Sequence, residues 1–150
     1  MSIEDDVALL DGVPTIHLLG RAAIRVLAIG SEQQDIASGA VLFREGDAAD
    51  CGYVVQRGTF RLRPPGGGGN GEVVAGPGAL IGELALIVPM ARPATATALQ
   101  PASVIRISRT LFQRVLDSEP DAARRLRDEF AIRTSQTASD LMLVSGRLMT

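Results

Sequence analysis

Residues with the capacity for chemistry concentrate in one stretch, residues 81–98, which reads IGELALIVPMARPATATA. Gly82 and Glu83 open this stretch, and Arg92 follows a short apolar run. A turn of helix after the glycine would offer backbone N–H groups to a phosphate. An arginine can bind the same phosphate with a charge-assisted fork, and a carboxylate can accept hydrogen bonds from sugar hydroxyls. The stretch is therefore suited to holding a small anionic sugar ligand.

Glu83 and Arg92 also admit a second interpretation, in which they form an ordinary ion pair on the protein surface. Such a pair stabilises a protein by only ~0–1 kcal/mol. Under this interpretation neither side chain would have a role in binding a ligand.

Length and composition indicate one domain without nucleic-acid or membrane partners. The chain has 150 residues, 46% of them hydrophobic, which is enough for one ordinary core. Its formal net charge of −2 provides no electrostatic basis for nucleic-acid binding by this chain alone. No apolar run is long enough to cross a bilayer, and Glu4, Asp5 and Asp6 make the N-terminus acidic where a signal peptide is basic. We therefore predict a cytoplasmic protein.

The inventory of reactive side chains argues against an enzyme. Cys51 is the single cysteine and His17 the single histidine, so neither a cysteine cluster nor a multi-histidine metal site is expected. All basic residues are arginines, which excludes Schiff-base chemistry on lysine. We expect no metal, no catalytic residues and no cofactor.

The elements that would position the stretch change type along the chain. Apolar residues recur at helical spacing over residues 3–12 and 16–29, with Pro14 as a break between the two helices. From about residue 33 the period changes to two, which is typical of strands. The predicted strands are residues 34–37, 40–43, 52–56, 59–63, 72–75, 95–98 and 103–107. Residues 64–71, rich in proline and glycine, are predicted to be a hairpin loop.

Two helices are predicted to follow the strands. Ser108 or Thr110 can cap the first, and Pro120 suits the first turn of the second, which we place at residues 121–146. Apolar residues and two threonines alternate at four- and three-residue steps along this last helix, a seam that would either cover the β core or form a dimer contact. The seam consists of Leu126, Phe130, Thr134, Thr137, Leu141, Val144 and Leu148.

In order and spacing, residues 81–98 resemble the phosphate-binding cassette of the cyclic nucleotide-binding domain family. Residues 41–47 (VLFREGD) and 53–58 (YVVQRG) resemble the paired signature of that family's early strands, in which the glycines form tight turns. The resemblance implies a mainly β fold: an eight-stranded β-roll (a double-stranded β-helix or jelly roll) with N-terminal helices and a long C-terminal helix.

The resemblance further implies a single cyclic nucleotide-binding domain over residues 1–150. Its N-terminal helices would occupy residues 1–32, the β-roll residues 33–108 with the cassette at 81–98, and the C-terminal helices residues 109–150.

The same resemblance assigns roles to individual residues. Glu83 would bind the ribose 2′-hydroxyl and Arg92 the cyclic phosphate, while backbone N–H groups from Gly82 to Leu86, that of Ala85 in particular, would contact the same phosphate. The C-terminal segment from Glu119 to Thr137 resembles the catabolite activator branch, in which a long helix pairs two subunits. The candidate ligand-binding residues are Gly82, Glu83, Leu84, Ala85, Arg92, Pro93, Ala94, Thr95, Arg133 and Thr137.

Within this set, Thr137 would reach the exocyclic amine of adenine and Arg133 would stack on the purine. A plain interfacial or solvated role is the other interpretation of these two residues.

Pro93 departs from the family's pattern, in which the residue after the arginine donates its backbone N–H to the phosphate. Proline has no N–H, and the loss of one donor costs about 0.5–3 kcal/mol, which can lower affinity about tenfold or more. A hydroxyl side chain at this position helps readers of cyclic GMP (cGMP), so its absence favours cyclic AMP (cAMP).

The sequence therefore predicts a non-enzymatic sensor of cyclic AMP, with cyclic GMP as the other candidate ligand. We expect a homodimer formed through the C-terminal helix and a downstream protein whose identity the sequence does not indicate. One alternative is an interaction module on a β-roll that has lost nucleotide binding. Another is the sensor half of a catabolite activator-like transcription regulator, in which a helix-turn-helix domain follows.

Overall fold

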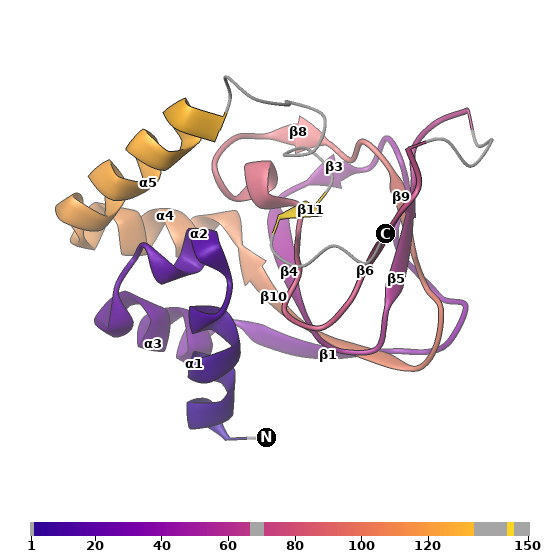
Figure 1. Cartoon of the computed structure of the whole chain (residues 1–150), viewed down its shortest axis with the longest axis horizontal. Helices are drawn as coiled ribbons and strands as arrows, with labels where there is room; N and C mark the ends of the chain where they lie inside the picture. The colour runs from indigo at the N-terminus through magenta and orange to yellow at the C-terminus, as the bar shows by residue number, and fades with distance from the viewer. Residues whose placement is uncertain (1, 67–70, 134–143, 146–150) are drawn as a thin grey trace.

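A computed structural model describes residues 2–66, 71–133 and 144–145, and shows a β-roll with helices on one side of it (Figure 1). The helices are α1 (Ile3–Asp11), α2 (Pro14–His17), α3 (Arg21–Gly30), the 3₁₀ helix η1 (Glu83–Leu86), α4 (Arg109–Ser118) and α5 (Pro120–Arg133). The strands are β1 (Glu32–Ile36), β2 (Val41–Phe43), β3 (Ala48–Ala49), β4 (Cys51–Arg57), β5 (Phe60–Arg63), β6 (Val73–Ala75), β7 (Leu80–Ile81), β8 (Met90–Ala91), β9 (Thr95–Ala98), β10 (Ala102–Ser108) and β11 (Val144–Ser145). This architecture confirms the predicted fold class.

The N-terminal helices begin as the sequence predicts and then differ in one respect. Ser2 caps α1 in a capping box, because its hydroxyl accepts from the N–H of Asp5 at 3.2 Å and the Asp5 carboxylate accepts in return. The helix predicted over residues 16–29 is instead two helices, α2 and α3. Gly20 separates them with a φ of +90°, a conformation that cannot continue a right-handed helix. Pro14 was predicted as a break between two helices, and it is also the first residue of α2.

The strands form three antiparallel sheets. A five-stranded sheet has the order β1-β10-β4-β7-β11, a four-stranded sheet has the order β2-β9-β5-β6, and β3 pairs with β8. Each strand predicted from alternation is present within one or two residues of its expected bounds. Strands β3, β7 and β8 were not predicted, because two residues are too few to show a period. The hairpin prediction is confirmed by the pairing of β5 with β6; residues 67–70 of its loop lie outside the described residues.

Two apolar clusters hold this arrangement together. One lies between the helices and the outer face of the five-stranded sheet, where Ile24, Phe112 and Ile107 are fully buried. The other fills the roll and includes Phe60 and Leu62 together with several alanines. The Thr/Ala alternation of β9 explains two of these alanines, Ala96 and Ala98, since every second side chain of a strand faces inward.

At the C-terminus the sequence prediction is right at first and then wrong. Ser108 caps α4 by accepting from the N–H of Leu111 at 3.1 Å, and Pro120 begins α5. The helix predicted over residues 121–146 is described only to Arg133, and Val144–Ser145 form a strand paired with β7. The edge of β7 offers backbone partners to this segment, and a β-branched valine fits a strand better than a helix.

The apolar seam of α5 covers the core in the part that is described. Ala122 and Leu126 are buried in the cluster beneath the helices, and Phe130 packs against it. Thr134, Thr137, Leu141 and Leu148 lie outside the described residues. The dimer contact along this seam stays a prediction.

Two glycines of the roll provide a matched test of its tight packing. Gly58 and Gly39 have nearly the same φ, +82° and +81°. An added Cβ would lie 2.7 Å from the Cβ of Ala102 at Gly58, whereas at Gly39 it would meet no atom of the described residues within 4 Å. We expect Gly39→Ala to lower the free energy of unfolding by about 1–2 kcal/mol, the cost of the left-handed conformation alone. Gly58→Ala adds an overpacking cost of about 1–3 kcal/mol. Urea unfolding of both variants measures the difference, and equal losses would contradict the packing described here.

Candidate functional site

The cassette begins with a glycine whose conformation and small size are both required. Gly82 follows β7 with a φ of +83° and starts the short helix η1. A Cβ at this position would lie 2.5 Å from Nη1 of Arg92 and 3.3 Å from the carbonyl oxygen of Cys51. The glycine therefore permits the turn and leaves room for the arginine beside it.

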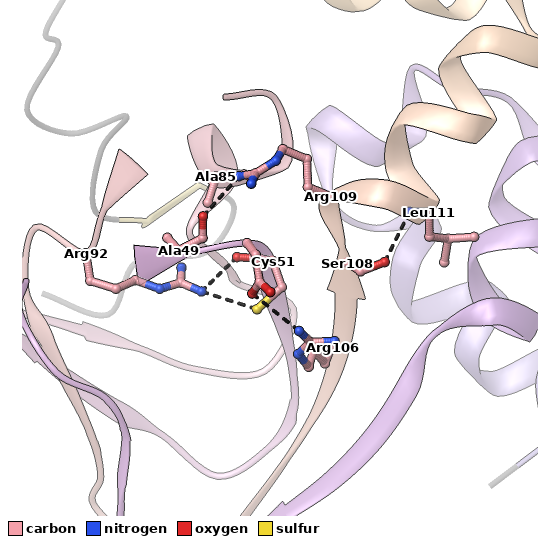
Figure 2. A network of polar contacts seen from close by, with 9 residues as sticks. Ala49, Cys51, Ala85, Arg92, Arg106, Ser108, Arg109 and Leu111 are labelled. Atoms are coloured by element: carbon pink, nitrogen blue, oxygen red, sulfur yellow. Dashed lines mark hydrogen bonds and ion pairs between the residues drawn. The ribbon is translucent and has the colours of Figure 1, made fainter. Parts of the chain in front are cut away.

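Arg92 extends into the roll and is only 4% exposed. Its Nη2 donates to the carbonyl oxygen of Cys51 at 2.9 Å and to the Sγ of the same residue at 3.2 Å (Figure 2). Its guanidinium carbon lies 4.3 Å from the ring centroid of Phe43 and 5.5 Å from that of Tyr53. We call this set, Phe43, Cys51 and Tyr53, the arginine seat.

The seat holds a cation without neutralising it. Burial of a charge is costly unless the charge is paired or hydrogen-bonded. A cation over an aromatic face gains about 0.5–2 kcal/mol, and a charge-assisted hydrogen bond to a carbonyl contributes further. None of the three seat residues is a carboxylate. The seat thus fixes the position of a guanidinium that can still attract an anion.

The main chain of Arg92 is fixed by the turn after β2. Its N–H donates to the carbonyl of Asp47 at 2.7 Å, and its carbonyl accepts from the N–H of Gly46 at 2.9 Å. The carboxylate of Asp47 closes the turn by accepting from the N–H of Arg44 at 3.0 Å. Gly46 has a φ of +90°, so the turn role that the resemblance implied for this glycine agrees with its conformation.

Glu83 is buried, with 1% of its surface exposed. Its carboxylate accepts a hydrogen bond from the hydroxyl of Thr15, a residue of α2. Because Arg92 is also buried, the interpretation of Glu83 and Arg92 as a surface ion pair is wrong. The contact with Thr15 connects the cassette to the N-terminal helices.

A family model described as the cyclic nucleotide-binding domain matches residues 33–119, which is more than half of the chain. The chain belongs to the cyclic nucleotide-binding domain family. The matched residues include the cassette, the arginine seat and α4.

Solved structures agree with this assignment. A cyclic nucleotide-binding-like protein from Brucella abortus is 38% identical, with a TM-score of 0.65 over 75% of this chain and 98% of the other. The N-terminal domain of a transcriptional regulator from Streptomyces coelicolor is 32% identical, with a TM-score of 0.75 over 87% of this chain and 94% of that domain.

Curated relatives are longer proteins. A cyclic nucleotide-gated potassium channel from Mesorhizobium japonicum is 30% identical over 131 residues, which are 87% of this chain and 36% of the channel. The chain spans between 6% and 53% of the length of the curated relatives it matches. In the part of the chain that the structure describes, no helix is long and apolar enough to cross a membrane.

The other cassette residues of this family member have individual surroundings. The N–H of Ala85 donates to the carbonyl of Gly82 at 3.1 Å, so it closes the first turn of η1. Leu84 faces a cavity between η1 and helices α4 and α5. Ala94 is buried in the roll, and the Oγ1 of Thr95 accepts from the N–H of Glu45 at 2.9 Å. Pro93 is half-buried and lies in the chain between Arg92 and β9.

The side chains of the two candidates for purine contact lie outside the described part of the chain, so their roles stay predictions. Arg133 is the last described residue of α5, and its side chain is outside the description. Thr137 lies outside the described residues altogether.

Sequence reasoning missed the seat and the contact of Thr15 with Glu83. Phe43 and Tyr53 lie in the two strand signatures, residues 41–47 and 53–58, for which the resemblance assigns a role only to the glycines. Strand alternation places Tyr53 and Cys51 on the same face of β4, and this could have indicated a shared role in the roll. No local signal marks Thr15, because its partner comes from a distant part of the chain.

Burial raises the pKa of Tyr53 to about 12, and the hydrogen bond and electrostatic interaction with the Cys51 side chain act in the same direction. The cations Arg92 and Arg106 oppose this shift but do not cancel it. The phenol therefore stays protonated at neutral pH and presents a neutral ring to Arg92.

This shift predicts a loss of stability at alkaline pH. A raised tyrosine pKa contributes stability that is fully present below the unfolded value of about 10 and is lost as the pH rises through about 12. The chain has one tyrosine and no tryptophan, so the tyrosinate absorbance reports Tyr53 alone. We expect its titration midpoint near 12, and we expect Tyr53→Phe to remove the fall in stability above pH 10 that this residue causes. A midpoint near the ordinary value of about 10 would contradict a buried ring.

Proposed function

We propose that this chain is a regulatory, non-enzymatic sensor that binds cyclic AMP in its β-roll. The single observation that carries the proposal is the buried Arg92, held in a seat that fixes its guanidinium without a carboxylate. Membership in the cyclic nucleotide-binding domain family supports a cyclic nucleotide as the anion. A cytoplasmic location belongs to the same proposal.

In this proposal the cassette divides the ligand between two side chains. Arg92 binds the cyclic phosphate with its guanidinium, which has five donors and needs only some of them for Cys51. Glu83 accepts from the ribose 2′-hydroxyl while Thr15 holds the orientation of the carboxylate. The proposed site also includes the backbone from Gly82 through Leu84 and Ala85, together with Ala94 and Thr95.

Pro93 sets the expected affinity and the preferred base. Its missing N–H removes one donor to the phosphate, which lowers affinity about tenfold relative to a complete cassette if that donor contributes about 1.4 kcal/mol. The absence of a hydroxyl side chain at position 93 favours cyclic AMP over cyclic GMP. No further cofactor is part of the proposal.

The signal would leave the domain through its C-terminal helices. Helix η1 contacts α4, and α4 contacts α5. A ligand that favours one position of the cassette therefore shifts the conformational equilibrium of both α4 and α5. Arg133 and Thr137 would complete the purine site. A dimer mate bound through the C-terminal helix, or a downstream protein, would receive the change.

A second candidate function is supported by two observations. Arg92 already has internal partners, and Pro93 lacks the expected donor, so the roll could serve as an interaction module without a nucleotide. The chain could also be the sensor part of a longer regulator, which is supported by its similarity to an N-terminal domain of a transcriptional regulator. Unlike the interaction module, a sensor part of this kind is compatible with cyclic AMP binding.

Thermal unfolding with and without cyclic AMP tests the assignment of Arg92. At about a hundredfold excess over Kd, a ligand stabilises the folded state by about 2.7 kcal/mol, which raises the Tm of a chain of this size by roughly 5–10 °C. We expect Arg92→Ala to fold but to lose this increase, and Arg92→Lys, which keeps the charge without the fork, to retain only part of it.

Arg63→Ala is the matched control, because Arg63 is half exposed and pairs with Glu72 on the surface. This variant should keep the full increase in Tm. An unchanged increase in Arg92→Ala would refute the site. Calorimetry with cyclic AMP and cyclic GMP separates the two candidate functions, since no heat with either ligand at millimolar concentration supports the interaction module.

A further inference from the structure

The C-terminal end of the cassette helix is capped by side chains of another helix. Nη1 of Arg109 donates to the carbonyl oxygens of Ala85 at 3.0 Å and Val88 at 3.1 Å. One turn later on α4, Nε2 of Gln113 lies 3.3 Å from the carbonyl oxygen of Leu86 and 3.4 Å from that of Ile87. Two side chains of α4 thus bind four consecutive carbonyls of the cassette.

These four carbonyls, two in the last part of η1 and two in the residues that follow it, need partners from elsewhere in the chain. The last carbonyls of any helix accept no hydrogen bond from an N–H of the same helix. Because η1 is only one turn long, this applies to the carbonyls at its end. The same end of a helix carries partial negative charge, which an arginine complements. Because both atoms facing Gln113 are acceptors, its amide must present the NH₂ group to them. Each of the four carbonyl oxygens therefore faces an N–H donor of Arg109 or Gln113.

Arg109 also ties the cap to the roll. The same Nη1 donates to the carbonyl of Ala49 in β3 at 3.0 Å (Figure 2), and the backbone N–H of Arg109 donates to the carbonyl of Asp50 at 2.8 Å. An Nη1 group has two hydrogens, so its three acceptors share them. Arg109 stands at the point where the roll, the cassette and α4 meet.

We propose that Arg109 and Gln113 are positioning residues that make the cassette and α4 move as one body. The proposal rests on the proposed function, because what they position is the phosphate- and ribose-binding end of the cassette. These hydrogen bonds hold the carbonyls from Ala85 to Val88. They thereby fix the orientation of the other end of η1, which carries Gly82 and Glu83, relative to Arg92. Movement of α4 is then transmitted to the ligand-binding groups.

Both side chains are only partly buried, so water can replace their hydrogen bonds when they are removed. The variants are therefore expected to fold. Arg109→Gln removes the cation and its fork, and Arg109→Lys keeps the charge. Gln113→Glu preserves shape but places carboxylate oxygens against two carbonyl oxygens, which repels the cassette. Arg114→Gln, at an exposed arginine of the same helix, is the matched control.

Amide hydrogen exchange of the ligand-free protein tests positioning without reference to any ligand. We expect Arg109→Gln and Gln113→Glu to raise the exchange rates of residues 83–88 about tenfold, with smaller changes in β4 and β10, and Arg109→Lys to restore part of the protection. In titrations with cyclic AMP, Kd should rise about tenfold in the first two variants. Arg114→Gln should change neither quantity.

Two results would overturn the positioning role. One is unchanged cassette exchange in both Arg109→Gln and Gln113→Glu, whatever their affinity. The other is an equal rise of exchange throughout the chain, which would make the two residues merely stabilising. If cassette exchange rises selectively but the unmodified protein does not bind cyclic AMP, the positioning role stands and the proposed function fails.

Discussion

A buried guanidinium without a carboxylate in its seat is the constraint on which this structure depends. Arg92 must be held firmly enough to offset the cost of removing a charge from water, and the carbonyl of Cys51 with the rings of Phe43 and Tyr53 does so. Gly82 must lack a Cβ to leave room for it. The raised pKa of Tyr53 keeps the ring beside the cation neutral.

The roll exists in this form because closure brings together strands that are distant in sequence. The turn from Arg44 to Asp47 holds the main chain of Arg92, and β3 pairs with β8 just before it. On the other side of the cassette, Thr15 contacts Glu83 and α4 contacts the C-terminal carbonyls of η1. The cassette is thus held from the roll and from both sets of helices, which is the arrangement that the proposed sensor requires if binding is to reach its helices.

The sequence was sufficient for the features that are local. The cassette order, the alternation of β9 and the cap of α4 at Ser108 each depend on residues close in the chain, and the fold followed from them. The seat and the Thr15 contact could not be predicted, because their members meet only when the roll closes. Gly20 divided a predicted helix through its left-handed conformation. Val144–Ser145 joined β7 because an open sheet edge outweighed helical spacing.

A crystal structure of the protein with cyclic AMP would locate the phosphate relative to Arg92. We expect a phosphate oxygen within about 3.2 Å of a guanidinium nitrogen of Arg92, with the ribose 2′-hydroxyl on Glu83. Nucleotide density away from Arg92, or none at millimolar ligand, would contradict the proposed site.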